Sequence, residues 1–231
     1  MDCESLSSVS IPESVKSIGT NAFRGCKMLE NISLPDDLKE IGSSAFEKCR
    51  NLATVSLAKV GKLGANAFQE CSNLQTLEIE GLNSIGNGAF MKCLSLKSIN
   101  LQGNFAELGM DTFNDCGNLT SISLPASIKK IESRVFLNCK SLTGIELPVS
   151  LNKLNDRVFE SCTSLKQIVI PGTVRSMGKS VFENCTMLDS VRIEGFIEEI
   201  DNDAFRKCHS LRAISIPVSV KKIGSKAFEE C

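Results

Sequence analysis

The residues of this sequence that most directly suggest chemistry are its eleven cysteines, because thiolates ligate metals, form disulfides and attack electrophiles. They recur every 22 or 23 residues, at Cys3, Cys26, Cys49, Cys71, Cys93, Cys116, Cys139, Cys162, Cys185, Cys208 and Cys231. Zinc sites draw ligands from close pairs such as CxxC, and a disulfide needs two Cβ atoms that face each other. One cysteine per repeat meets neither requirement, because equivalent residues of stacked repeats have parallel Cβ vectors. The spacing therefore predicts a ladder of buried, unreactive thiols, with Cys3 and Cys231 exposed and oxidisable at the ends.

The other candidate reactive groups are a single histidine and several carboxylate pairs. His209 follows Cys208 in a predicted surface turn, and no motif supports a Ser-His-Asp arrangement or a metal site around it. The carboxylate pairs fall at positions predicted to be solvated, among them Asp36-Asp37, Glu198-Glu199 and Glu229-Glu230. Glycines recur singly, so the sequence has no phosphate-binding loop. We therefore expect no catalytic residues, no metal and no cofactor, and we do not expect an enzyme.

Charge and hydropathy limit the classes of partner. The 26 Lys and Arg residues nearly balance the 27 Asp and Glu residues, for a formal net charge of -1. No global field therefore attracts nucleic acid or an anionic membrane. No apolar run approaches the roughly 18 to 20 residues of a membrane helix, and the first residues, MDCESLSSVS, lack the features of a signal peptide. We expect a soluble chain without an export signal, nucleic-acid binding or membrane insertion.

The cysteines belong to a repeat that covers the whole chain. A leucine follows each cysteine from Cys3 to Cys208 after three residues, and a phenylalanine precedes each cysteine from Cys26 onward by three. These phenylalanines are Phe23, Phe46, Phe68, Phe90, Phe113, Phe136, Phe159, Phe182, Phe205 and Phe228; Phe105 and Phe196 lie elsewhere. Such a period is typical of solenoids, so residues 1–231 are predicted to form a single domain of about ten repeats of 22–23 residues.

No capping sequence is evident at either end of this repeat array. Residue 3 already lies inside a repeat, and residue 231 is a repeat mark. Two alternatives follow: the chain is a fragment of a longer array, or its open ends stack on other molecules. The repeats ending at Cys71 and Cys93 are one residue shorter and lack the proline, which either a local change of curvature or neutral drift explains.

One repeat, residues 29–51, shows how the pattern predicts local structure. The segment 32–34 alternates as a buried strand does, and Pro35 ends it because proline cannot donate to a ladder. An extended stretch then reaches Gly42, which is expected to turn the chain with a positive φ. After it, Ser43 or Ser44 is expected to cap a single helical turn that buries Phe46 and the residues at spacing three from it. Stacking would bury these apolar side chains and pair the strands in parallel, one per repeat.

The unit LxxIxLPxxVxxIGxxAFxxCxx, nearly intact in residues 29–51 and 119–141, resembles the BspA-like class of leucine-rich repeats. The absence of the Asn in LxxLxLxxNxL points to this class rather than to the commoner repeat. The resemblance implies a right-handed coil with one long parallel β-sheet on the concave face and short extended or helical turns on the convex side. It also implies binding or adhesion at a cell surface or after secretion, and it brings no catalytic residues.

The exposed face of the predicted sheet is the candidate binding surface. In each strand the side chain between two buried ones points outward. These residues are Ser10, Ser33, Ser56, Glu78, Asn100, Ser123, Glu146, Val169, Arg192 and Ser215. With the flanking positions included, the candidate partner-binding residues are Glu78, Asn100, Glu146, Lys166, Val169, Asp189, Arg192 and Arg212, the alternative being that they are merely solvated strand residues. The sequence has no Trp and no Tyr, so we expect weak binding by one copy and useful affinity through multivalency.

Two functions therefore remain open. The first is a non-catalytic protein-binding or adhesion module whose partner is a host, neighbouring-cell or identical protein. The second is an intracellular scaffold or a structural element that self-associates end to end, which the unpaired cysteines favour because thiols persist in the cytosol. The two imply different compartments, and the sequence does not decide between them.

Overall fold

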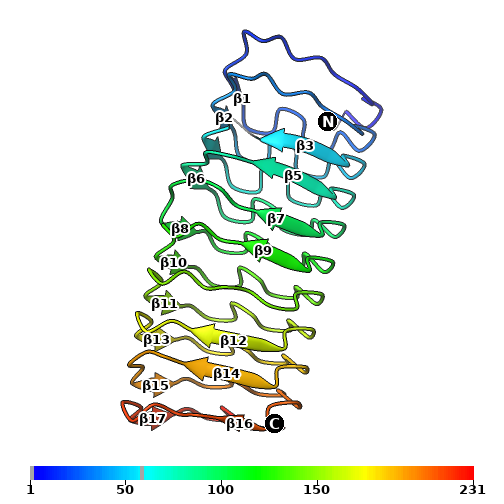
Figure 1. Ribbon diagram of the computed structural model, residues 1–231. Coiled ribbons are helices and arrows are strands. Elements are labelled where there is room, and N and C mark those ends of the chain that lie inside the picture. Colours follow the sequence, from blue (N-terminus) through cyan, green and yellow to red (C-terminus); the bar gives the residue numbers. More distant parts are fainter. Residues whose placement is uncertain (1–2, 58–59) are drawn as a thin grey trace.

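The structure, a computed structural model, describes residues 3–57 and 60–231 as a column of stacked coils (Figure 1). Each coil combines extended segments with a run of turns around the conserved phenylalanine and cysteine. The described residues contain no helix, and hence none that could cross a membrane. The predicted parallel solenoid is therefore confirmed.

The LxxIxL segments form the longer strands. These are β3 (Thr54–Leu57), β5 (Thr76–Ile79), β7 (Ser98–Asn100), β9 (Ser121–Ser123), β12 (Gln167–Ile170), β14 (Ser190–Ile193) and β16 (Ala213–Ile214). They form three parallel groups, β3-β5, β7-β9 and β12-β14-β16. Equivalent residues are paired, for example Val55 with Leu77 and Val169 with Arg192, so the register does not slip from coil to coil. The first of the two shorter repeats, which ends at Cys71, has one residue fewer after β3 than the others. Residues 58–59 of that stretch lie outside the described part.

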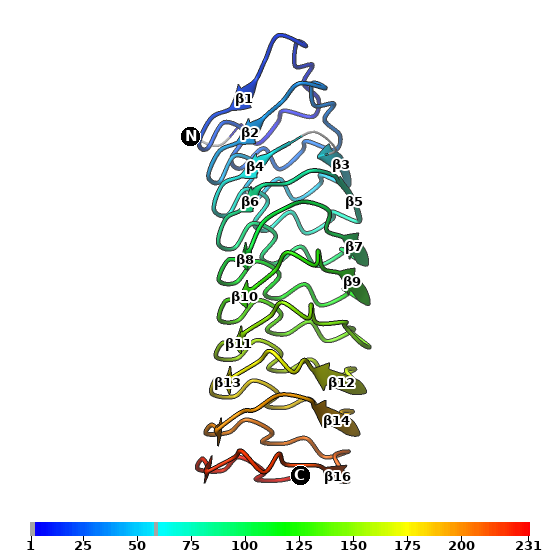
Figure 2. The ribbon, with the colours of Figure 1, turned by 60° about the vertical axis from the view of Figure 1, so that its left-hand side comes forward.

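A second strand per coil lies on a different side of the column, where the sequence predicted only an extended stretch (Figure 2). These strands are β1 (Ser17–Ile18), β2 (Glu40–Ile41), β4 (Lys62–Leu63), β6 (Ser84–Ile85), β8 (Glu107–Leu108), β10 (Lys130–Ile131), β11 (Lys153–Leu154), β13 (Ser176–Met177), β15 (Glu199–Ile200) and β17 (Lys222–Ile223). They also pair in parallel, in the orders β1-β2-β4-β6, β13-β11-β10-β8 and β15-β17. Stacked coils bring any extended segment beside its copy, so a two-residue stretch suffices for pairing.

The predicted helical turn is wrong. Ser44 and Lys48 have φ values of 53° and 64°, in the left-handed region, which no α-helix contains. The amide of Phe46 donates to the carbonyl of Ala67 in the next coil at 2.8 Å, while the amide of Cys49 donates to Phe46 at 3.1 Å. Amides thus alternate between the next coil and their own turn. A single repeat sequence does not reveal this, because half of the acceptors belong to the neighbouring coil.

Gly42 does not have the positive φ expected from the sequence. Glycine at this position allows close contact between coils in several repeats, whereas Glu132, Asn155 and Asp201 occupy it in others. A Cβ at Gly64 would lie 2.4 Å from the backbone nitrogen of Ser43, and one at Gly86 would lie 2.4 Å from that of Ala65. The first left-handed residue after this position comes two residues later, as Ser44 or Asn66.

The interior is one continuous core of leucine, isoleucine, phenylalanine and cysteine side chains. The ten repeat phenylalanines stack in nine successive pairs, with ring centroids 5.1–5.8 Å apart and interplanar angles of 1–14°. Phe136 and Cys139 both have 0% exposure, which confirms the predicted dry interior. Phe105, outside the repeat pattern, is buried in the core as well.

Replacing Gly86 with alanine tests the close contact between coils. The added methyl would overlap the backbone near Ala65, so we expect a loss of about 1–3 kcal/mol in the free energy of unfolding. The matched control is Gly19→Ala, at the equivalent position of the first coil, where a Cβ meets nothing within 4 Å. Equal urea midpoints for the two variants would contradict this account.

Candidate functional site

All eight predicted partner-binding residues are exposed. Glu78, Asn100, Val169 and Arg192 are outward residues of strands β5, β7, β12 and β14, and Glu146 takes the same position in a coil without a long strand. We call the surface formed by these outward positions the strand face; Figure 1 shows its strands stacked along the column. Lys166, Asp189 and Arg212 lie just before strands β12, β14 and β16.

Three of the predicted residues line one hollow of about 780 Å³ on the strand face, which we call the strand-face hollow. They are Glu146, Val169 and Arg192, and Gly144 and Ile145 lie between them and β9. Glu78 and Asn100 do not line this hollow. The Arg192 guanidinium forms an ion pair of 2.7 Å with Glu194, whereas the Glu146 carboxylate has no such partner among the described residues.

The long-strand ladder is interrupted at the strand-face hollow. Residues 144–146 form no strand, and in the described part of the chain their backbone groups make no hydrogen bond to a neighbouring coil. Gly144 replaces the side chain that Ser121 and Gln167 provide in adjacent coils, and a Cβ there would meet nothing within 4 Å. Glycine weakens a strand because it costs more backbone entropy and packs no side chain. The hollow therefore exposes backbone donors and acceptors as well as side chains.

The other three predicted residues line a second hollow, of about 630 Å³. Lys166, Asp189 and Arg212 meet there with His209 and with Met187, which is 47% exposed. None of the three charged side chains forms an ion pair or hydrogen bond within the described residues. The sequence predicted a solvated turn at His209 and gave no link to these charges. Residues that directly follow a cysteine and residues just before a long strand become neighbours only when coils stack.

Phe196, an exposed aromatic residue, was not among the predicted binding residues. Phe196 is 68% exposed, and the Arg175 guanidinium of the preceding coil lies 6.0 Å from its ring centroid. Its sequence signal was its position outside the phenylalanine repeat. Equivalent positions carry hydroxyls that bond the preceding coil, as Ser150 and Thr173 do. Phe196 thus replaces a polar contact with an accessible apolar surface.

The thiols form hydrogen bonds between coils. The Sγ atom of each cysteine from Cys49 to Cys231 donates to the carbonyl of the phenylalanine in the preceding coil, at 3.0–3.3 Å. Burial raises the pKa of Cys49, Cys116 and Cys208 to about 12, so they stay protonated near neutral pH. Cys3 and Cys231 are exposed, as predicted. No group of three or more potential metal ligands exists in the described part of the chain.

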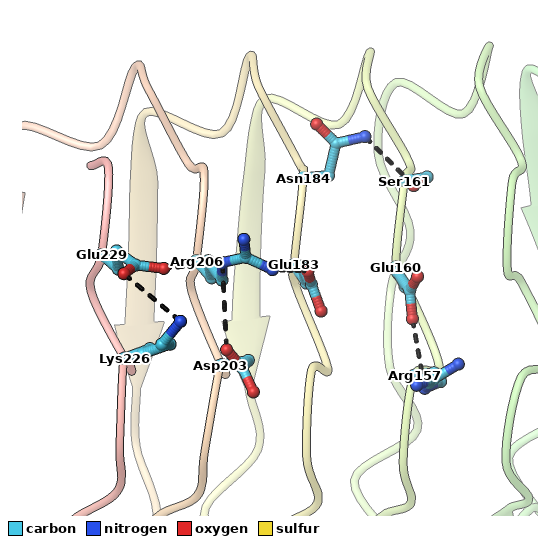
Figure 3. A network of polar contacts seen from close by, with 9 residues as sticks. All are labelled: Arg157, Glu160, Ser161, Glu183, Asn184, Asp203, Arg206, Lys226 and Glu229. Carbon is cyan, nitrogen blue, oxygen red and sulfur yellow. Dashed lines mark hydrogen bonds and ion pairs between the residues drawn. The ribbon is translucent and has the colours of Figure 1, made fainter.

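Charged groups on the turn side form a network across the last coils (Figure 3). The Arg206 guanidinium binds Glu229 and Glu183 in the flanking coils, each at 2.8 Å. Burial and the nearby Glu183 raise the pKa of Glu160, whose carboxylate lies 3.5 Å from the Arg157 guanidinium. None of the four hollows found in the described residues is lined by Glu160. The network therefore ties neighbouring coils together.

This fold and its exposed strand face define a leucine-rich-repeat solenoid. The family pattern described as BspA type leucine rich repeat region, with six copies, matches residues 1–119 and residues 106–231. The chain belongs to this family, whose repeats typically serve protein interaction. Its members are typically non-enzymatic.

Solved structures support the same assignment. A leucine-rich repeat protein from Bacteroides ovatus is 30% identical, with a TM-score of 0.80, and covers 99% of this chain, which spans 65% of that protein. One from T. pallidum is 31% identical over 79% of this chain and 78% of that protein, with a TM-score of 0.62. A leucine rich cell surface protein from Faecalibacterium prausnitzii, 23% identical over 97% of this chain and 79% of its own, shares the fold with a TM-score of 0.56. A comparison with curated protein sequences finds no match.

Stability should fall steeply at alkaline pH. The buried thiols keep their protons well above the ordinary pKa of 9.0, whereas the unfolded chain releases them near that value. The unfolded state then binds fewer protons, so each buried thiol lowers the free energy of unfolding by about 1.4 kcal/mol per pH unit above that value. Urea titrations between about pH 8 and about pH 11 measure this. Cys3→Ser, at an exposed position, should leave the slope unchanged; a flat profile would contradict burial of the ladder.

Proposed function

We propose that this chain is a non-catalytic protein-binding module that holds an extended polypeptide segment in the strand-face hollow. The observation that carries the proposal is the coincidence of Glu146, Val169 and Arg192 with an interrupted strand ladder. Free backbone donors and acceptors at residues 144–146 are the groups that an extended peptide pairs with when it binds a sheet. Ile145 and Val169 supply apolar contacts beside them.

The charges of the hollow favour a partner with a basic side chain. Glu146 has no ion-pair partner among the described residues, while Arg192 is neutralised by Glu194 at 2.7 Å. The hollow therefore presents one uncompensated negative charge next to apolar surface. The sequence has no Trp or Tyr to anchor a tight interface, so a single module binds weakly and gains affinity through several copies. Asn100 and Glu78 extend the strand face beyond the hollow and would contact a longer partner.

The second hollow provides an additional contact region in this proposal. Lys166, Asp189 and Arg212 keep unpaired charges there, beside the exposed Met187. A partner that follows the column from one hollow to the other would meet charges of both signs. The family resemblance supports adhesion at a cell surface as the setting, and cysteines that form no disulfide among the described residues support an intracellular scaffold as the alternative.

Filling the strand-face hollow should weaken partner binding without unfolding the protein. Linear peptides selected on the wild-type chain by phage display should bind Gly144→Gln and Glu146→Lys roughly tenfold more weakly. Glutamine is the residue at the equivalent position 167, so the fold accommodates it. Lys153→Glu, on strand β11 outside the strand face, is the charge-reversal control. Unchanged affinity for both strand-face variants, or sub-nanomolar binding of a single copy, would refute the proposal.

We also propose self-association as a second function, because the residues in and near β16 and β17 include exposed apolar side chains. Val218 is 103% exposed, Ile223 51% and Ile216 41%. Sedimentation of the 231-residue chain should show larger species at high concentration. Val218→Lys should shift it toward monomer, whereas Val149→Lys, at the equivalent and also exposed position of an inner coil, should not. A strict monomer at high concentration would contradict end-to-end stacking.

A further inference from the structure

A further concave surface, distinct from the two hollows described above, lies on the turn side of the column, away from the strand face. It is a groove of about 570 Å³ formed by residues that directly precede or follow five successive cysteines, Cys49 to Cys139. We call it the turn-side groove. None of its lining residues belongs to either strand ladder, and none of them lines the strand-face hollow.

The groove lies where short side chains stand between two long ones in the row of residues that follow the cysteines. The residue after the cysteine is Arg50 in one coil and Lys140 four coils later, but between them it is Ser72, Leu94 and Gly117. Leu94 is 49% exposed, and a Cβ on Gly117 would meet nothing within 4 Å. Ser72 and Gly117 thus leave an open floor. The apolar Leu94 side chain lies on this floor, which has Arg50 at one end and Lys140 at the other.

The charges along the groove are not balanced internally. Its two carboxylates are already engaged, Glu70 with Arg50 at 3.2 Å and Asp115 with the Asn138 amide at 2.8 Å. By contrast, the ammonium groups of Lys92 and Lys140 form no ion pair or hydrogen bond within the described residues. The lining has three cations and two carboxylates, a net charge of +1, and the two ammonium groups with no ion-pair partner among the described residues lie on either side of the Gly117 opening.

We propose that the turn-side groove binds an acidic, extended peptide segment, with one carboxylate on Lys92, a second on Lys140 and an aliphatic side chain on Leu94. The two lysines are two coils apart, roughly 10 Å at a spacing of about 4.8 Å per coil. Acidic residues three positions apart lie on one side of a chain in the polyproline II conformation, and at about 3.1 Å per residue they match this separation. The groove lining has no aromatic ring on which a sugar or a base would stack, which favours a peptide over a glycan or a nucleic acid.

The direct test measures fluorescence anisotropy of a labelled, capped hexapeptide with two glutamates three positions apart and a leucine between them. Added to the intact 231-residue chain, it should bind in a salt-sensitive manner. The variant Lys92→Glu/Lys140→Glu should weaken binding at least roughly tenfold, and Gly117→Gln should do the same by filling the floor. A peptide with lysines in place of the glutamates should not bind.

Matched variants separate this site from the strand face and from misfolding. Lys129→Glu/Lys153→Glu makes the same charge change at two exposed, unpaired lysines outside the groove, and Gly144→Gln fills the strand-face hollow. Both should bind the acidic peptide as the wild type does. Gly117→Gln and Gly144→Gln should retain the wild-type urea midpoint, since neither Cβ meets an atom within 4 Å.

Four results would overturn the proposal. One is equal peptide binding by Lys92→Glu/Lys140→Glu and the wild type, and another is no binding at millimolar peptide. The third is a heparin oligosaccharide that displaces the peptide and binds more tightly than it, which would make the groove a polyanion site. Loss of peptide binding in Gly144→Gln but not in Gly117→Gln would also refute it, and would assign the peptide to the strand-face hollow.

Discussion

The structure depends on in-register stacking of coils whose backbones bond to one another on every side. Long strands and short strands pair in parallel at equivalent residues, and turn amides donate to the next coil, as that of Phe46 does to Ala67. The buried phenylalanine carbonyl shows how close the fit is: that of Phe46 accepts the amide of Cys49 and also the thiol of Cys71, each at 3.1 Å. Both lone pairs of this oxygen are used, so a shift of one residue in the register between neighbouring coils would leave buried polar groups unsatisfied. The cysteine is suited to this position because it is apolar enough for the core and still donates one weak hydrogen bond.

In such a stack of coils, inward residues determine stability and outward residues determine surface chemistry. Inward positions repeat with little variation because each side chain packs against its own copies, as the phenylalanine stack does. Outward positions contact fewer neighbours, so their identity can change from coil to coil at little cost in stability. The distinctive surfaces arise where the sequence departs from the repeat. Gly144 interrupts the strand ladder, Gly117 opens the turn side, and Phe196 replaces a hydroxyl that elsewhere bonds the preceding coil.

The two candidate binding surfaces differ in chemistry and in position. The strand-face hollow combines exposed backbone groups with an unpaired carboxylate, Glu146, whereas the backbone of the turn-side groove is bonded from coil to coil and the groove presents unpaired ammonium groups. A basic partner would therefore bind in the strand-face hollow and an acidic partner in the turn-side groove. Both surfaces are open at once because they lie on different sides of the column. Neither has an aromatic anchor, which agrees with a protein that gains affinity by repetition.

The sequence alone determined the period, the core positions and the family, because each depends on residues that recur at fixed spacing along one chain. It identified Phe136 and Cys139 as buried and Glu146, Val169 and Arg192 as exposed. The tertiary structure alone decided the features that involve two coils. It replaced the expected helical turn by left-handed residues such as Ser44, gave the glycine row a steric reason, and brought His209 beside Lys166 and Arg212. The physical reason is that stacked coils provide each other's hydrogen-bond acceptors and neighbours, which are about 23 residues away in the sequence and invisible within a single repeat.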